Sequence, residues 1–64
     1  MKWFNVELLR SDAEKLQQLL YNLEASFEIS AAGPLYHFEI LLDPEGSKIK
    51  TVEKFLYADS IEEV

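Results

Sequence analysis

The residues best suited to chemistry in this sequence are one histidine and the carboxylates around it. His37 is the single histidine, Glu39 follows it two residues later, and Glu7 and Glu28 lie upstream. Imidazole and carboxylate groups can ligate a metal ion or act as an acid/base pair. One histidine with scattered carboxylates is a weak signal for either role. We therefore expect an exposed cross-strand pair of Glu28 with Glu39 and assign no catalytic or metal-ligating residue.

Other signatures of catalysis or cofactor binding are missing from the sequence. It contains no cysteine, which excludes disulfides and thiolate metal sites. It also lacks a Gly-x-Ser-x-Gly motif, a phosphate-binding P-loop and a dinucleotide-binding fingerprint. A chain of 64 residues has little room for an enclosed pocket. We predict a protein without enzymatic activity and without a cofactor.

Charge is distributed unevenly along the chain. Twelve acidic residues outnumber six basic ones, for a net charge of −6, and no lysine or arginine occurs between residues 24 and 47. Phosphate backbones and anionic membranes attract basic residues, so we expect no direct binding to nucleic acid or membranes. The acidic surface suits a basic protein partner instead. Its candidate residues are Glu24, Glu28, Asp43, Glu45, Asp59, Glu62 and Glu63.

The composition predicts one small folded domain over residues 1–64. Hydrophobic residues make up 48% of the chain, which is too apolar for a disordered protein. No apolar run approaches the length of a transmembrane helix, and no signal-peptide pattern is present. The sequence therefore predicts a cytoplasmic domain close to the lower size limit for independent folding.

The clearest local pattern predicts a helix from Ser11 to Ala25. In a capping box, the Ser11 hydroxyl would accept from the amide of Glu14, and the Glu14 carboxylate would accept from the amide of Ser11. Leucines then recur with the spacing of one helix face, at Leu16, Leu19, Leu20 and Leu23. This stripe predicts that the helix packs against the core.

Alternating apolar residues predict three strands, over 2–9, 26–31 and 35–42. The Gly33-Pro34 pair predicts a hairpin between the last two, in which residues 27, 29 and 31 pair with 40, 38 and 36. Residues 47–57 favour a helix because Val52, Phe55 and Leu56 do not alternate. The β-branched residues Ile49, Thr51 and Val52 keep a strand as the alternative. Residues 60–64 are expected to form a short edge strand.

The order β-α-β-β-α, with a short last strand, predicts the split β-α-β or ferredoxin-like class of α+β fold. Both helices would cover one face of an antiparallel sheet with strand order 4-1-3-2. The expected core comprises Phe4, Val6, Leu8, Leu16, Leu19, Leu20, Leu23, Phe27, Ile29, Phe38, Ile40, Val52, Phe55 and Leu56.

In length and element order, the whole chain resembles ACT-like domains, which are small regulatory modules that pair and bind amino acids. The resemblance implies a small-ligand sensor with sites at a dimer interface. ACT domains usually carry a glycine between the first strand and the first helix, whereas this sequence has Arg10-Ser11-Asp12 there. No ligand residue is assigned from the resemblance.

The sheet face away from the helices is the predicted interaction surface. Pairing of the first and third strands would place Trp3 near Leu41 and Leu9 near Leu35, with polar residues between these apolar ends. The residues of this predicted surface are Trp3, Asn5, Glu7, Leu9, Leu35, His37, Glu39 and Leu41.

Three functions are compatible with these patterns. The first is a noncatalytic interaction or regulatory module that forms a homodimer or docks on a protein partner through the open sheet face. The second is a small acidic inhibitor of the phage type, which would block a nucleic-acid-binding enzyme by charge mimicry. The third is the ACT-like amino-acid sensor. We rank the first highest because it requires the fewest specific residues.

Overall fold

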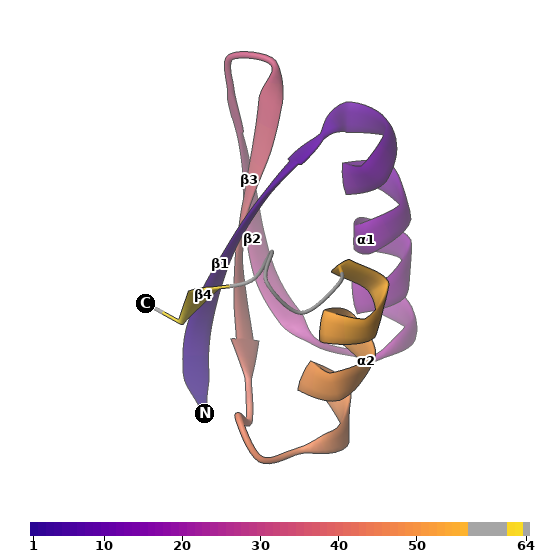
Figure 1. The fold of residues 1–64 in the computed structure, drawn as a ribbon, viewed down its shortest axis with the longest axis vertical. Coiled ribbons are helices and arrows are strands. Elements are labelled where there is room, and N and C mark those ends of the chain that lie inside the picture. The colour runs from indigo at the N-terminus through magenta and orange to yellow at the C-terminus, as the bar shows by residue number, and fades with distance from the viewer. Residues whose placement is uncertain (57–61, 64) are drawn as a thin grey trace.

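The computed structural model describes residues 1–56 and 62–63. It confirms an α+β fold in which an antiparallel sheet has the strand order β2-β3-β1-β4. Both helices lie on the same side of the sheet (Figure 1). The elements are β1 (Lys2–Leu9), α1 (Arg10–Asn22), β2 (Ser26–Ala32), β3 (Leu35–Leu42), α2 (Ser47–Leu56) and β4 (Glu62–Glu63). Within the described residues, neither helix is long and apolar enough to cross a membrane.

The core lies between the helices and the covered sheet face. Side chains from β1, β3, α1 and α2 fill it, and no charged or polar side chain of the described residues is buried there. Its buried members are Phe4, Val6, Ala13, Leu16, Leu20, Phe38, Ile40, Leu42, Ile49, Val52 and Leu56. Leu8, Leu19, Leu23, Phe27 and Phe55 pack against them with partial exposure.

Ile29 was predicted in the core, and this prediction is wrong. Its side chain points to the helix side of the sheet, opposite the buried Phe38, yet remains 39% exposed. β2 is the outermost strand, and the ring of Tyr21 on α1 contacts Phe27, with 5.4 Å between the ring centroids. The helix therefore covers the first part of β2 and leaves Ile29 accessible.

The junction between β1 and α1 corrects the predicted capping box. Leu9 is still extended and pairs with Leu35, and the helix begins at the next residue, Arg10. Leu9 occupies the N-cap position, where no side chain makes a capping hydrogen bond. Ser11 therefore lies inside the first turn, because the strand continues to the last residue before the helix. Arg10 instead forms an exposed ion pair with Glu14, with 3.5 Å between nitrogen and oxygen.

The end of α1 is also earlier than predicted, at Asn22 instead of Ala25. The amide of Ala25 donates to the carbonyl of Leu20, and the amide of Glu24 donates to that of Tyr21, each at 3.0 Å. These two bonds define a Schellman motif, in which the residue after the C-cap is left-handed and usually glycine. Here that residue is Glu24, with φ of 55°.

Replacing Glu24 with glycine is expected to stabilise the domain. A left-handed conformation costs a non-glycine residue about 1–2 kcal/mol, part of which the unfolded-state entropy of glycine offsets. We expect Glu24→Gly to raise the free energy of unfolding by about 0.5–1 kcal/mol, measured by urea denaturation. Glu24→Ala removes the charge but keeps the strained backbone and serves as the control. An equal gain in both variants would attribute the effect to the charge.

The β2–β3 hairpin has the predicted register. Phe27, Ile29 and Ala31 pair with Ile40, Phe38 and Tyr36, and the ladder continues to Ala32 opposite Leu35. Gly33 and Pro34 form the two-residue connection, and Gly33 has the positive φ, 64°, that such turns require. Glycine adopts this conformation without a steric penalty.

The second helix confirms the favoured interpretation of residues 47–56. α2 buries Ile49, Val52 and Leu56 on one face. Before it, the Asp43 carboxylate accepts a hydrogen bond from the amide of Glu45 at 3.0 Å, and the Asp43 carbonyl accepts one from Gly46 at 3.0 Å. This turn reverses the chain after β3 and brings α2 onto the core.

Candidate functional site

The open face of the sheet has the register that the sequence predicted. Trp3 pairs with Leu41, and Leu9 pairs with Leu35 at the opposite end. Between them lie two polar pairs, Asn5 with Glu39 and Glu7 with His37. Because paired residues of antiparallel strands project to the same side, all eight predicted residues share this face. The predicted pairing of β1 with β3 is therefore confirmed, and the role of this face as an interaction surface stays a prediction.

β2 extends the open face by four residues, of which the sequence predicted only Glu28, as the cross-strand partner of Glu39. Ser26, Glu28, Ser30 and Ala32 lie opposite Leu41, Glu39, His37 and Leu35. Glu28 was also assigned to a separate acidic surface, and the alternation of β2 was the signal that could have placed Ser26, Ser30 and Ala32 on this face.

The open face of β1, β2 and β3 is acidic. It carries three carboxylates, from Glu7, Glu28 and Glu39. Lys2 is the one basic residue of these three strands, and the alternation of β1 places it on the side of the sheet that carries Phe4 and Val6. The open face of these strands therefore has no lysine or arginine.

His37 and Glu39 form the polar centre of this face. The nitrogen Nε2 of His37 lies 3.8 Å from Oε1 of Glu39, and both side chains keep access to solvent. Glu28 is directly opposite Glu39, so two carboxylates face each other across the β2–β3 pair. Like charges at this position oppose sheet formation by a few tenths of a kcal/mol up to about 1 kcal/mol. The sequence predicted this Glu28–Glu39 pair.

A hollow of about 440 Å³ lies beside this centre, lined by Glu28, Ile29, Ser30, His37 and Glu39. Among the residues that the structure describes, no three histidine or carboxylate side chains come together in a way that could hold a metal ion. The hollow opens to solvent at the edge of the sheet. The carboxylates of Glu28 and Glu39 in its lining can accept hydrogen bonds from another molecule, so the hollow is suited to be part of a contact surface.

The two ends of the open face are apolar. Trp3 is 40% exposed and Leu9 is 58% exposed, while their cross-strand partners Leu41 and Leu35 are half-buried. Apolar side chains of this size on an exposed sheet face favour contact with another surface, because burial removes them from water. The face thus combines apolar ends with an acidic middle.

Asn5 carries an unusual polar atom in the middle of this face. Its Oδ1 is buried and has no hydrogen-bond partner among the described residues. Asn5 lies between Glu39 of β3 and Glu62 of β4 in the sheet register. A buried acceptor without a donor costs about 1–3 kcal/mol, so the free domain gains no stability from this oxygen.

Three more of the predicted acidic residues lie away from the open face. Glu24 follows the end of α1, and Asp43 and Glu45 lie in the turn before α2. Glu62 and Glu63 form β4, and Asp59 is outside the described residues. Of Glu24, Glu28, Asp43 and Glu45, only Glu28 joins the carboxylates of the open face, so these four residues do not form one continuous acidic surface.

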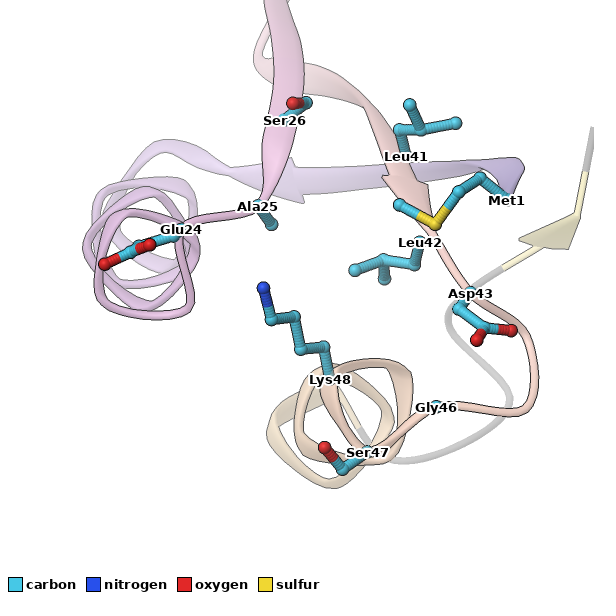
Figure 2. A pocket seen from close by; sticks show the side chains of 10 residues that line it. All are labelled: Met1, Glu24, Ala25, Ser26, Leu41, Leu42, Asp43, Gly46, Ser47 and Lys48. Carbon is cyan, nitrogen blue, oxygen red and sulfur yellow. The ribbon is translucent and has the colours of Figure 1, made fainter.

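A second pocket, of about 330 Å³, lies where α1 ends, β3 ends and α2 begins. Figure 2 shows the side chain of Lys48 extending from α2 across this pocket toward Ala25, with Leu42 beside it. Glu24 and Asp43 line the rim. This pocket was not predicted from the sequence, because it depends on how α2 meets the end of β3.

The ACT-like resemblance would place a ligand at the turn between β1 and α1. That turn does not exist in this structure, because α1 begins directly after the last residue of β1. Comparison of the chain with protein-family models, curated proteins and solved structures found no match. The functional assignment therefore depends on the geometry of the open face.

Proposed function

We propose that this domain is a noncatalytic protein-interaction module that docks on a basic protein surface through its open sheet face. A single observation carries the proposal: exposed apolar side chains lie at both ends of the face, with three carboxylates, His37 and no lysine or arginine of β1, β2 or β3 between them. Such a layout suits a partner with apolar contacts on either side of lysine or arginine residues.

The charges favour a different protein over a second copy as the partner. Two copies joined through this face would bring Glu7, Glu28 and Glu39 close to the same residues of the other copy, without a lysine or arginine of these strands to pair with them. Each chain also carries a net charge of −6. We further propose that the fold belongs to the ferredoxin-like class. The element order β-α-β-β-α and the position of both helices on one side of the sheet support this proposal (Figure 1).

The open surroundings of His37 support the noncatalytic part of the proposal. His37 lies on an open sheet with one carboxylate at 3.8 Å, and its neighbours across the strands are Glu7 and Ser30. General acid/base catalysis needs a substrate held within hydrogen-bond reach of the group that transfers the proton. The hollow of about 440 Å³ beside His37 is open to solvent, so it does not enclose a substrate against this group.

The test isolates the partner by affinity capture from cells that express the protein and then titrates the purified partner. We expect the dissociation constant of the wild type to rise steeply with salt, because screening weakens the contacts of the carboxylates. The double variant Glu28→Gln/Glu39→Gln should bind about tenfold more weakly, a loss of about 1.4 kcal/mol. Its dissociation constant should also change less with salt.

The control is a double variant with the same change in net charge, Glu14→Gln/Glu45→Gln. Glu14 lies on α1 and Glu45 lies in the turn before α2, so both are away from the open face. The dissociation constant of this control should stay within about twofold of the wild type. Equal losses in the two double variants would assign the effect to net charge and contradict docking through the open face.

A further inference from the structure

The free edge of β2 is a second feature that the open-face proposal does not use. Within the described part of the chain, β2 pairs only with β3 and forms one border of the sheet. In an antiparallel pair, every second residue directs its amide and carbonyl away from the partner strand. β2 therefore presents a row of main-chain donors and acceptors along its outer side.

Apart from the charge of Glu28, this edge lacks the usual features that block strand pairing. Natural edge strands are protected by charged side chains, above all lysine, and by proline, bulges or very short length. β2 has seven residues without lysine, arginine or proline, and its pairing with β3 is continuous from Ser26 to Ala32. The tip of the β2–β3 hairpin also projects beyond the start of α1 (Figure 1). The edge is open to an additional strand.

The side chains on the two sides of β2 differ in chemistry. On the helix side, Ile29 is 39% exposed, and Tyr21, whose ring contacts Phe27, is 61% exposed. On the open side, Glu28 is exposed and faces Glu39. An added strand would place alternate side chains against these two surfaces. It would therefore need apolar residues on the helix side and a basic residue beside Glu28.

A second copy of the chain fits this edge poorly. Pairing two β2 strands around Ile29 would put Glu28 opposite Ser30 of the second copy, and the two Glu28 residues would be diagonal neighbours. Diagonal residues on a sheet are about 7–8 Å apart, so the carboxylates would repel each other next to the Glu28–Glu39 pair. A basic strand would offset the same charges.

We infer that β2 accepts an extended, basic segment of a partner protein as an additional strand. Main-chain hydrogen bonds to the outer edge hold the segment. Its apolar side chains contact Ile29 and Tyr21, and a lysine or arginine lies beside Glu28. This mode of recognition is β-strand addition, in which main-chain bonds give affinity and alternate side chains give specificity. It goes beyond the proposed function because it uses the sheet edge instead of Trp3 and Leu41.

The probe is a capped, fluorescein-labelled heptapeptide of alternating valine and lysine, measured by fluorescence anisotropy. We expect saturable binding to the wild type. Binding should be at least tenfold weaker with glutamate in place of lysine, or with all peptide amides methylated. Ile29→Lys should weaken binding at least tenfold because it removes the apolar contact with the valines of the probe. Glu28→Lys should do the same because it repels the lysines of the probe. Both substitutions are at exposed positions, and thermal melting verifies that the variants fold.

Two further measurements distinguish strand addition at β2 from a nonspecific attraction between a cationic peptide and an acidic protein. Hydrogen exchange at the outward amides of β2 should slow at least tenfold when the probe is saturating. Trp3→Ala, at the far end of the open face, should leave the affinity for the probe unchanged. The inference is overturned by unchanged exchange in β2, by equal binding of the methylated peptide, or by a loss of affinity with Trp3→Ala that equals that of Ile29→Lys. It is also overturned if the free protein sediments as a dimer with protected β2 amides.

Discussion

Replacing Phe38 with alanine is expected to unfold the domain. Phe38 is fully buried on the central strand β3, where it pairs with Val6 of β1 and Ile29 of β2. Its ring centroid lies 5.9 Å from that of Phe27. Removing a buried phenylalanine ring costs about 3–5 kcal/mol. A chain of this size has a total stability on the order of 3–10 kcal/mol, so the loss consumes much or all of it.

Urea denaturation followed by circular dichroism measures this effect. For Phe38→Ala we expect either an unfolded spectrum in the absence of urea or a transition shifted by about 3 kcal/mol or more. The matched control is Ile29→Ala on the neighbouring strand, whose side chain is 39% exposed. This control should lose about 1 kcal/mol or less because solvent already reaches the side chain. Similar losses in both variants would contradict a core centred on Phe38.

Replacing Trp3 with alanine is expected to have the largest effect on partner binding. Trp3 is a large aromatic side chain at one end of the open face, and it is 40% exposed in the free domain. Buried tryptophans at interfaces are frequently hot spots, with losses of about 2–4 kcal/mol on truncation. We therefore expect Trp3→Ala to raise the dissociation constant of the captured partner by roughly 30-fold to 1,000-fold. The stability of the free domain should change much less, because much of the ring is already exposed to water.

Tyr21→Ala is the control for this prediction. Tyr21 is also an exposed aromatic residue, at 61%, but it lies on α1 and contacts Phe27 on the covered side of the sheet. Calorimetric titration with the purified partner should show a smaller loss of affinity for this variant than for Trp3→Ala, because Tyr21 does not lie on the open face. If Tyr21→Ala weakened binding as much as Trp3→Ala, the partner would not be docking through the open face.

The strands and their register could be predicted from sequence because the alternation of side chains is a local property. The apolar residues of both hairpin strands must share one face, which leaves one register, and the structure has this register. In it, Phe27, Ile29 and Ala31 pair with Ile40, Phe38 and Tyr36. The same alternation of side chains along β1 and β3 placed Trp3 opposite Leu41. The open face was predictable for the same reason, since it comprises the residues that the core does not use.

The errors arose where tertiary contacts override local preference. Ser11 and Glu14 have the sequence of a capping box, but pairing of Leu9 with Leu35 carries the strand up to the helix. The helix ends early because Glu24 adopts a left-handed conformation that sequence patterns favour only for glycine or asparagine. Exposure of Ile29 depends on how far α1 reaches across β2. These features depend on the three-dimensional position of a second element.

The separation of the acidic residues into distinct groups also required the structure. Glu24, Glu28 and Asp43 belong to one basic-free stretch of sequence, yet only Glu28 lies on the open face. Glu24 and Asp43 line the pocket beside Lys48. Charge density along a chain therefore overestimated the size of the acidic surface, because successive elements direct their side chains to different sides of the molecule.

The direct passage from β1 into α1 has a mechanical consequence for binding. With no intervening residue, the strand that carries Trp3 and Glu7 has no flexible joint to the helix that forms much of the core. The contact surface and the scaffold beneath it should then move as one rigid body. A preorganised surface loses little conformational entropy on association, so more of the contact energy is retained as affinity. The absence of a loop at this junction is thus an advantage for recognition, although loops are the usual place for binding residues.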